Sequence, residues 1–482
     1  MNRKMIFYMT GQLVKVEALL LLLPLAVSLI YRERCAVPFL ITIAIALMIG
    51  FALSAFCRSQ NRVIYAKEGF VIVAFCWVIL SMIGALPFYI SREIPSYIDA
   101  FFETVSGFTT TGASILTDVE SMSRGLLFWR SFTHWIGGMG VLVFIVALIP
   151  AVSDRSIHIL RAEMPGPTVD KLVPRAKDTA KILYLIYIVM TALEIALLCA
   201  GGMNLFESIV HAFGTAGTGG FGVKADSIAS YSPYLQWVIG VFMLLFGVNF
   251  NLYYLLLIRR FRAFWKSEEL WAYLGIAAAA VGVITVNLMS VYGRFSDALR
   301  DSFFQVSSIM TTTGYATADF DLWPNGCRAI LLLLMFIGAC AGSTGGGLKI
   351  SRLVLLFKMI KREFRHMLHP RSVGVIQFEG RKINDHTLTN VAVYFVLYVL
   401  IMVVLFLYLC LTEPFDLTTN LSAAAACFNN IGPGLGAVGP TCSYAAYSGL
   451  SKIVLSVAML LGRLELFPLL FAFAPSVWFK KK

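Results

Sequence analysis

Charged residues are scarce in this sequence. Only 14% of its 482 residues are charged, against about 25% in soluble domains, and 59% are hydrophobic. No stretch is both polar enough and long enough to form a soluble domain, although the length alone would suggest about three of them. We therefore expect a single all-α domain that is dissolved in a lipid bilayer.

The motifs of enzymes and of nucleic-acid-binding proteins are also missing. The nine cysteines form no CxxC pair, and most of them lie inside apolar runs, as small buried hydrophobes do. No HExxH motif or Cys/His cluster surrounds His134, His211 or the other histidines, so neither a metalloprotease nor another enzyme is expected. The net charge of +12 is spread over short gaps between apolar runs rather than over one folded face, which argues against a nucleic acid partner. Nothing in the chain indicates an organic cofactor.

Long apolar runs are what the sequence has instead. A helix needs about 20 apolar residues to cross the hydrocarbon core of a membrane. Ten runs meet this criterion: Gly11–Tyr31, Ala36–Phe56, Gly69–Ile90, Gly125–Pro150, Lys181–Gly201, Pro233–Ile258, Glu269–Tyr292, Ala329–Phe357, Thr389–Leu411 and Lys452–Trp478. Charged residues rather than a small-residue cleavage site follow the first run, so we interpret it as a retained helix and not as a signal peptide.

The basic residues in the gaps predict the orientation of these ten spans, because cytoplasmic loops are enriched in Lys and Arg. With the N-terminus inside, the cytoplasmic segments hold 24 Lys and Arg residues and the opposite gaps hold 8. The segment 358–388 alone holds seven. Both termini are therefore predicted to be cytoplasmic.

Four of the five external gaps are about 30 to 40 residues long, and each contains an amphipathic run that ends in a glycine-rich turn. The first and third turns both contain Thr-Thr-Thr-Gly, at 109–112 and 311–314. The second contains Ala-Gly-Thr-Gly-Gly-Phe-Gly at 216–222, and the fourth contains Asn-Asn-Ile-Gly-Pro-Gly at 429–434. This repetition predicts four structurally related units.

The four turns suit a cation-binding ring. A moderately apolar segment of 10 to 14 residues is too short to cross the membrane and suits a re-entrant helix. Irregular backbone at that depth is tolerated where it lines a water-filled cavity or is buried in protein. Glycine lets the backbone aim successive carbonyls inward, and rings of such carbonyls replace the water shell of potassium in channels. The alternative is that each turn merely ends a helix, but its recurrence at four matching positions argues against that.

At these residues the sequence resembles the Trk/Ktr/HKT superfamily of potassium transporters. The resemblance covers essentially the whole chain and includes Arg161–Pro167, Gly338–Lys349 and Gly462–Glu465. The additional N-terminal helix pair is similar to that of TrkH-type subunits of bacterial Trk systems, because Ktr subunits begin directly with the repeats.

The resemblance implies two N-terminal helices followed by four pseudo-symmetric M1-P-M2 units (helix, re-entrant pore helix, helix) around a central pore. The implied domains are 1–62 for the helix pair and 63–155, 156–262, 263–368 and 369–482 for the four units. The implied filter residues that hold the transported K⁺ are Thr110, Thr111, Gly112, Gly217, Thr218, Gly219, Thr312, Thr313, Gly314, Asn430, Ile431 and Gly432. In the superfamily, serine at the first filter glycine accompanies sodium preference, so Gly112 favours potassium.

A glycine cluster interrupts the eighth span. By resemblance it forms an intramembrane loop that obstructs the pore, with gate residues Gly342, Gly345, Gly346, Gly347, Lys349 and Arg463. A packing kink is one alternative. A phosphate-binding P-loop is another, but its lysine position is occupied by Leu348 and no strand is expected before it.

Three ionisable residues lie inside apolar runs, where charge is costly and by default functional. Arg463 and Glu465 are two residues apart, so they should point to different faces of a helix. By resemblance Arg463 projects into the pore as a positive barrier, and the alternative is a structural ion pair with another helix. Glu194 is expected to be a satisfied packing residue.

The function expected from these features is potassium uptake across a bacterial inner membrane. The resemblance further implies a homodimer of pores and a cytosolic nucleotide-binding regulator of the TrkA (RCK) type. Two alternatives stay open at this point, namely a Ktr-like Na⁺-dependent K⁺ translocator and a membrane scaffold without conduction.

Overall fold

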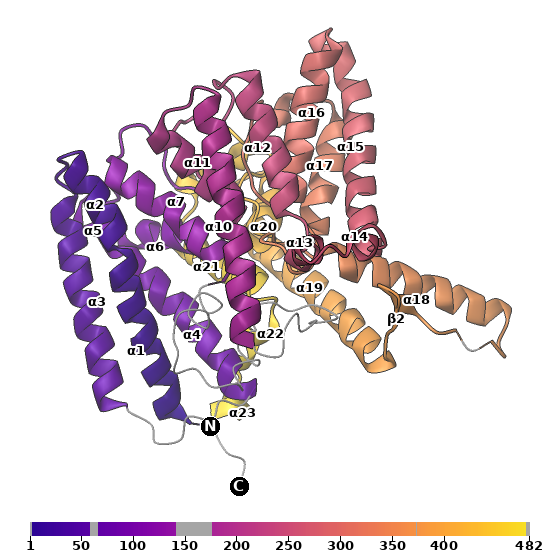
Figure 1. Cartoon of the computed structure of the whole chain (residues 1–482), viewed down its shortest axis with the longest axis horizontal. Coiled ribbons are helices and arrows are strands. Elements are labelled where there is room, and N and C mark those ends of the chain that lie inside the picture. The colour runs from indigo at the N-terminus through magenta and orange to yellow at the C-terminus, as the bar shows by residue number, and fades with distance from the viewer. Residues whose placement is uncertain (1, 58–65, 141–175, 373, 479–482) are drawn as a thin grey trace.

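The computed structural model describes residues 2–57, 66–140, 176–372 and 374–478, and these residues are almost entirely helical (Figure 1). The chain begins with the helices α1 (Arg3–Leu20), α2 (Leu22–Ile30) and α3 (Ala36–Phe56), of which α1 and α3 pack side by side. Four units follow, each with a first helix, a short second helix and a third helix, as the sequence predicts.

The helices of the four units correspond in order. The first helices are α4 (Ala66–Gly84), α10 (Ala176–Ala200), α15 (Glu268–Tyr292) and α19 (Asp385–Thr412). The short second helices are α6 (Tyr97–Phe108), α11 (Leu205–Gly217), α16 (Phe295–Met310) and α20 (Leu417–Phe428). The third helices are α7 (Arg124–Gly138), α12 (Pro233–Phe246), α17 (Asn325–Ile337) and α21 (Gly449–Arg463).

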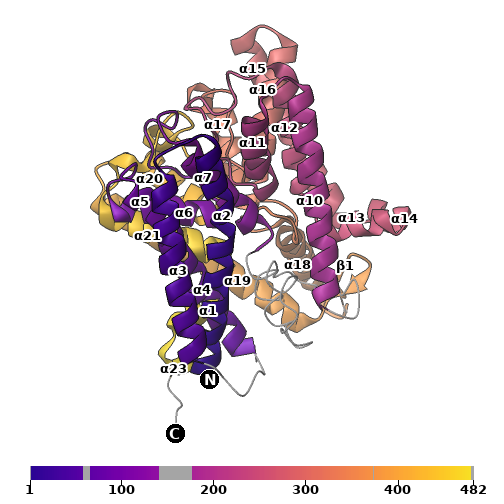
Figure 2. The same cartoon turned by 60° about the vertical axis from the view of Figure 1, so that its left-hand side comes forward.

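Shorter elements complete the described chain. They are α5 (Leu86–Ile90), α13 (Phe250–Leu257), α14 (Phe261–Trp265), α18 (Ile350–Leu368), α22 (Phe467–Phe473), α23 (Pro475–Trp478), the 3₁₀ turns η1 (Phe320–Leu322), η2 (Gly436–Val438) and η3 (Tyr444–Ala446), and the strands β1 (Gln377–Phe378) and β2 (Arg381–Lys382). The strands form an antiparallel hairpin beside α18, which projects from the body of the molecule (Figures 1 and 2).

The third helices differ from the sequence prediction. Six helices of the described residues are long and apolar enough to span a membrane, or seven when the bent pair α12 and α13 counts as one span. The runs Pro233–Ile258 and Lys452–Trp478 are therefore not single straight spans, because α12 and α13 meet at 91° and α21 ends at Arg463. The break in the eighth run is confirmed, since residues 338–349 separate α17 from α18. The third helices are thus short, and each ends next to a glycine.

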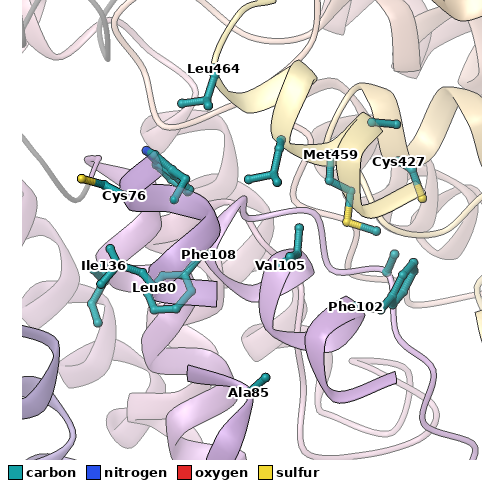
Figure 3. Close-up of a cluster of buried hydrophobic side chains, with 14 of the residues drawn as sticks. Cys76, Leu80, Ala85, Phe102, Val105, Phe108, Ile136, Cys427, Met459 and Leu464 are labelled. Atoms are coloured by element: carbon teal, nitrogen blue, oxygen red, sulfur yellow. The ribbon is translucent and has the colours of Figure 1, made fainter. Parts of the chain in front are cut away.

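The core lies where the short second helices meet their neighbours. Figure 3 shows Leu80 of α4 and Phe108 of α6 against Ile136 of α7, with Met459 of α21 near Val105. Nearly every residue in the second half of α6 and of α20 is buried. Buried, non-spanning helices of this kind are the predicted re-entrant segments.

The two ends of the described chain lie together. The Arg3 guanidinium donates a hydrogen bond to the Trp478 carbonyl over 3.0 Å, and Figure 1 shows both ends at the lower side. This agrees with an even number of crossings, while the cytoplasmic placement stays a prediction. The second half of the run Gly125–Pro150, the motif Arg161–Pro167 and the two boundaries near 62 and 155 fall outside the described residues, and the exact domain limits also stay predictions.

Candidate functional site

The four glycine-rich turns share one backbone conformation. Each has a left-handed residue followed by a residue whose N–H bonds back to the pore helix, five residues earlier in the chain. The left-handed residues are Thr110, Thr218, Thr312 and Asn430, with φ between 56° and 59°. The N–H groups that bond back are those of Thr111, Gly219, Thr313 and Ile431, over 2.8 to 2.9 Å. The next residue in each turn is a glycine with positive φ, namely Gly112, Gly220, Gly314 and Gly432.

This correspondence changes the register of the second turn by one residue. The sequence predicted Gly217, Thr218 and Gly219 as the counterparts of Thr110, Thr111 and Gly112. In the structure Gly217 is the last residue of α11, and the equivalent triplet is Thr218, Gly219 and Gly220. The triplets of the first, third and fourth turns align as predicted.

The four turns close into a ring, because each positive-φ glycine packs against a carbonyl of another unit. A Cβ atom added to Gly112 would overlap the carbonyl oxygen of Gly219 in the second unit. The corresponding contacts run from Gly220 to Thr313, from Gly314 to Ile431, and from Gly432 back to Thr111, 2.7 Å away in this last case. Four helix C-termini and their carbonyl oxygens therefore surround one point, which places partial negative charge there.

Side chains hold the ring together from behind. The hydroxyls of Thr109 and Thr111 lie 2.8 Å apart, as do those of Thr311 and Thr313. The Asn430 amide donates to Thr111 Oγ1 over 2.9 Å, which joins the fourth unit to the first. The ring is thus a cross-linked assembly rather than four independent turns.

A buried ion pair that the sequence analysis missed supports the first turn. Glu103 of α6 and Arg130 of α7 pair over 2.6 Å, and both are at most 4% exposed. Arg130 also donates to the carbonyl of Gly222 over 3.1 Å and stacks on the Phe221 ring, so it reaches the second unit. The available signal was a charge inside the fourth apolar run, which the same argument used for Arg463 would have selected.

Two cavities lie on either side of the ring. The wide cavity, of about 430 Å³, is lined by all four ring glycines together with Arg130. The narrow cavity, of about 50 Å³, is lined by Gly342, Ser343, residues 345–347, Lys349 and Arg463. The structure therefore brings all six predicted gate residues together in one place, on the side of the ring opposite the wide cavity.

The loop of residues 338–349, called here the gate loop, presses against the ring. The Gly346 N–H donates to Thr312 Oγ1 over 2.6 Å, and Lys349 Nζ donates to the Gly345 carbonyl. This long non-helical segment is more than a packing kink. The helix α17, rather than a strand, precedes it, so the P-loop alternative has no structural support.

Arg463 and Glu465 point to different partners, as their spacing predicts. The Arg463 guanidinium donates to the carbonyl of Thr344 in the gate loop over 2.7 Å and to the carbonyls of Gly137 and Gly138 over 2.5 and 2.7 Å. Glu465 instead forms an ion pair with Arg352 of α18. The structural ion pair considered for Arg463 thus belongs to Glu465.

Glu194 does not match the expectation of a satisfied packing residue. Its side chain is completely buried, but neither carboxylate oxygen has a hydrogen-bond partner in the described residues. Burial without a partner disfavours an ionised carboxylate.

Comparisons with known proteins agree with this geometry. The model of the TrkH family, described as a cation transport protein, matches residues 37–482. The chain is 38% identical to the Trk system potassium uptake protein TrkH of Salmonella typhimurium, over 99% of this chain and 100% of the relative. It is 31% identical to the Trk system potassium uptake protein TrkI of Halomonas elongata, over 96% of this chain and 94% of the relative. The crystal structure of the potassium transporter TrkH from Vibrio parahaemolyticus superposes with a TM-score of 0.90 at 34% identity, covering 99% of this chain and 100% of that one.

Proposed function

This chain belongs to the TrkH family of cation transport proteins, and we propose that it takes up potassium across the inner membrane of a bacterium. The observation that carries the proposal is the closed ring of carbonyls and glycines contributed by four units. Such a ring replaces the water shell of a dehydrated cation. Relatives named for potassium uptake support potassium as the transported ion, and so does glycine at position 112.

The gate loop and Arg463 are proposed to form the barrier to conduction. They fill the space below the ring and leave a cavity of only about 50 Å³. A positive charge about 4 Å from a cation costs about 4 kcal/mol even at an effective dielectric of 20. Conduction would therefore require the loop and the guanidinium to leave the ion path together, because Arg463 is bonded to Thr344 of that loop.

A cytosolic nucleotide-binding regulator of the TrkA type is proposed to act on this gate, and the pore is proposed to be a homodimer. The exposed, basic helix α18 with the following hairpin offers the regulator a surface on the side predicted to be cytoplasmic. Chemical cross-linking in native membranes tests this. A TrkA-type protein should be recovered with the wild-type chain, and its absence from every cross-linked product would contradict the proposal.

Ion flux in reconstituted vesicles tests the proposed function. The wild-type chain should pass K⁺ in preference to Na⁺, and it should do so without added Na⁺. A strict requirement for Na⁺ would favour the Ktr-like alternative, and absence of flux in every variant would favour a scaffold. Deleting Gly345 and Gly346, or replacing Arg463 with Ala, should raise K⁺ flux without a regulator. A destabilised Arg463→Ala protein with no gain of flux would show that this residue is structural.

A further inference from the structure

One carboxylate oxygen binds both ends of the gate loop. Glu269 Oε1 accepts hydrogen bonds from the N–H of Ala341 over 2.7 Å and from the N–H of Ser351 over 3.1 Å. Glu269 lies in the first turn of α15 and is 4% exposed. Hydrogen bonds from N–H groups to an ionised acceptor are about twice as strong as neutral ones. This side chain therefore fixes the two points where the glycine segment leaves and rejoins the protein.

A second glutamate connects this point to the cytoplasmic hairpin. Glu379, in the turn between β1 and β2, accepts from Ser267 Oγ over 2.9 Å and from the Glu269 N–H over 3.0 Å. Ser267 is itself the N-cap of α15. Lys358 of α18 donates to the Gln377 carbonyl of β1 over 2.7 Å, which holds the hairpin against the helix that follows the gate loop.

We propose that Glu269 is a positioning residue that latches the gate loop in its obstructing arrangement, and that Glu379 links this latch to the cytoplasmic surface. The chain of contacts runs from the hairpin turn, through the start of α15, to Ala341 and Ser351. A partner that displaces the hairpin withdraws Glu379 from the backbone of Glu269 and loosens both ends of the loop at once. This inference rests on the proposed function, since it assigns a role in gating.

The test combines hydrogen exchange of the gate loop with K⁺ flux in vesicles. Glu269→Ala should raise exchange in peptides that cover 338–351 by roughly tenfold, the change expected when a charge-assisted hydrogen bond is lost, and it should raise regulator-independent flux. Glu269→Gln keeps an amide oxygen that can accept both N–H groups, so it should restore most of the protection. Glu379→Ala should give a smaller increase of the same kind, because it removes only the outer contact.

Asp385→Asn is the matched control, because it removes a carboxylate from the same surface, where Asp385 pairs with Arg362. It should leave loop exchange and flux unchanged. In a protein that lacks Gly345 and Gly346, the Glu269→Ala change should add no further flux, whereas a purely structural role would lower thermal stability equally in both backgrounds.

Unchanged loop exchange in both Glu269→Ala and Glu379→Ala would overturn the latch, and Glu379 is exposed enough for its replacement to leave the fold intact. Increased flux on loop deletion without increased flux in Glu269→Ala would also overturn it while leaving the gate in place. If no variant conducts, the proposed function fails, and loop exchange still decides whether Glu269 holds the loop.

Discussion

Replacing Gly112 with serine tests the ring at its most constrained point. Gly112 has a φ of 77°, and a non-glycine residue there costs about 1 to 3 kcal/mol. The added Cβ would stand closer to the Gly219 carbonyl oxygen than the 3.0 Å that real Cβ contacts respect. Because that oxygen belongs to the backbone of the neighbouring unit, the carbonyl itself would have to retreat by roughly 1 Å.

The size of the effect follows from where this strain is released. The pore helices behind the ring are buried and closely packed, so the carbonyls that face the ion are the groups with room to move. A strain of about 1.4 kcal/mol changes an equilibrium tenfold. The preference for K⁺ over Na⁺ should therefore fall by about 10- to 100-fold in Gly112→Ser, mainly through weaker K⁺ binding.

The measurement is the ratio of K⁺ to Na⁺ flux in vesicles that contain equal amounts of protein. Gly293→Ser is the control, because Gly293 has a φ of 67° but nothing within 4 Å of an added Cβ. It should carry the backbone cost without any change in selectivity. A Gly112→Ser protein with the wild-type flux ratio would refute the argument that this glycine is required by the contact with Gly219.

Three further outcomes are expected. Gly220→Ala should lower the K⁺ preference as Gly112→Ser does, whereas Gly222→Ala should not, since an added Cβ there meets nothing closer than 3.6 Å; equal effects on the flux ratio would contradict the revised register. Arg130→Ala leaves Glu103 buried and unpaired and should lower the free energy of unfolding by about 3 to 5 kcal/mol in thermal denaturation. Glu194→Leu removes a buried group without a hydrogen-bond partner and should leave the melting temperature equal or higher, so a large decrease would point to a functional partner.

The sequence predicted the four-unit fold because its signals are local. Spans follow from apolar length, and the break in the eighth span follows from the glycines between 342 and 347. The bend between α12 and α13 was missed because Gly247 is a single glycine in an apolar run, and hydropathy does not penalise it. The bend is stabilised by distant partners, since the Gly247 carbonyl accepts from Cys340 and the Phe250 N–H donates to Gly342.

The candidate site was predicted wherever one local solution existed. Thr-Thr-Gly at 110–112 and 312–314 leaves a single position for the positive-φ glycine. The second turn offers consecutive glycines at 219 and 220, and either suits a helix end. Only the contact of Gly220 with the carbonyl of Thr313 selects between them, and that contact exists only in the assembled ring.

The breaks in the third helices are mutually dependent, and this bears on how the pore can open. A helix that ends inside a bilayer exposes backbone groups that lipid cannot satisfy. Here those groups are satisfied by other units: Gly247 by Cys340, Gly342 by Phe250, and the carbonyls of Gly137 and Gly138 by Arg463. The gate loop supplies or receives most of these bonds, so it cannot move without exposing backbone in the neighbouring units. Opening therefore requires water to enter as the loop leaves, which couples the removal of the barrier to the hydration of the ion path.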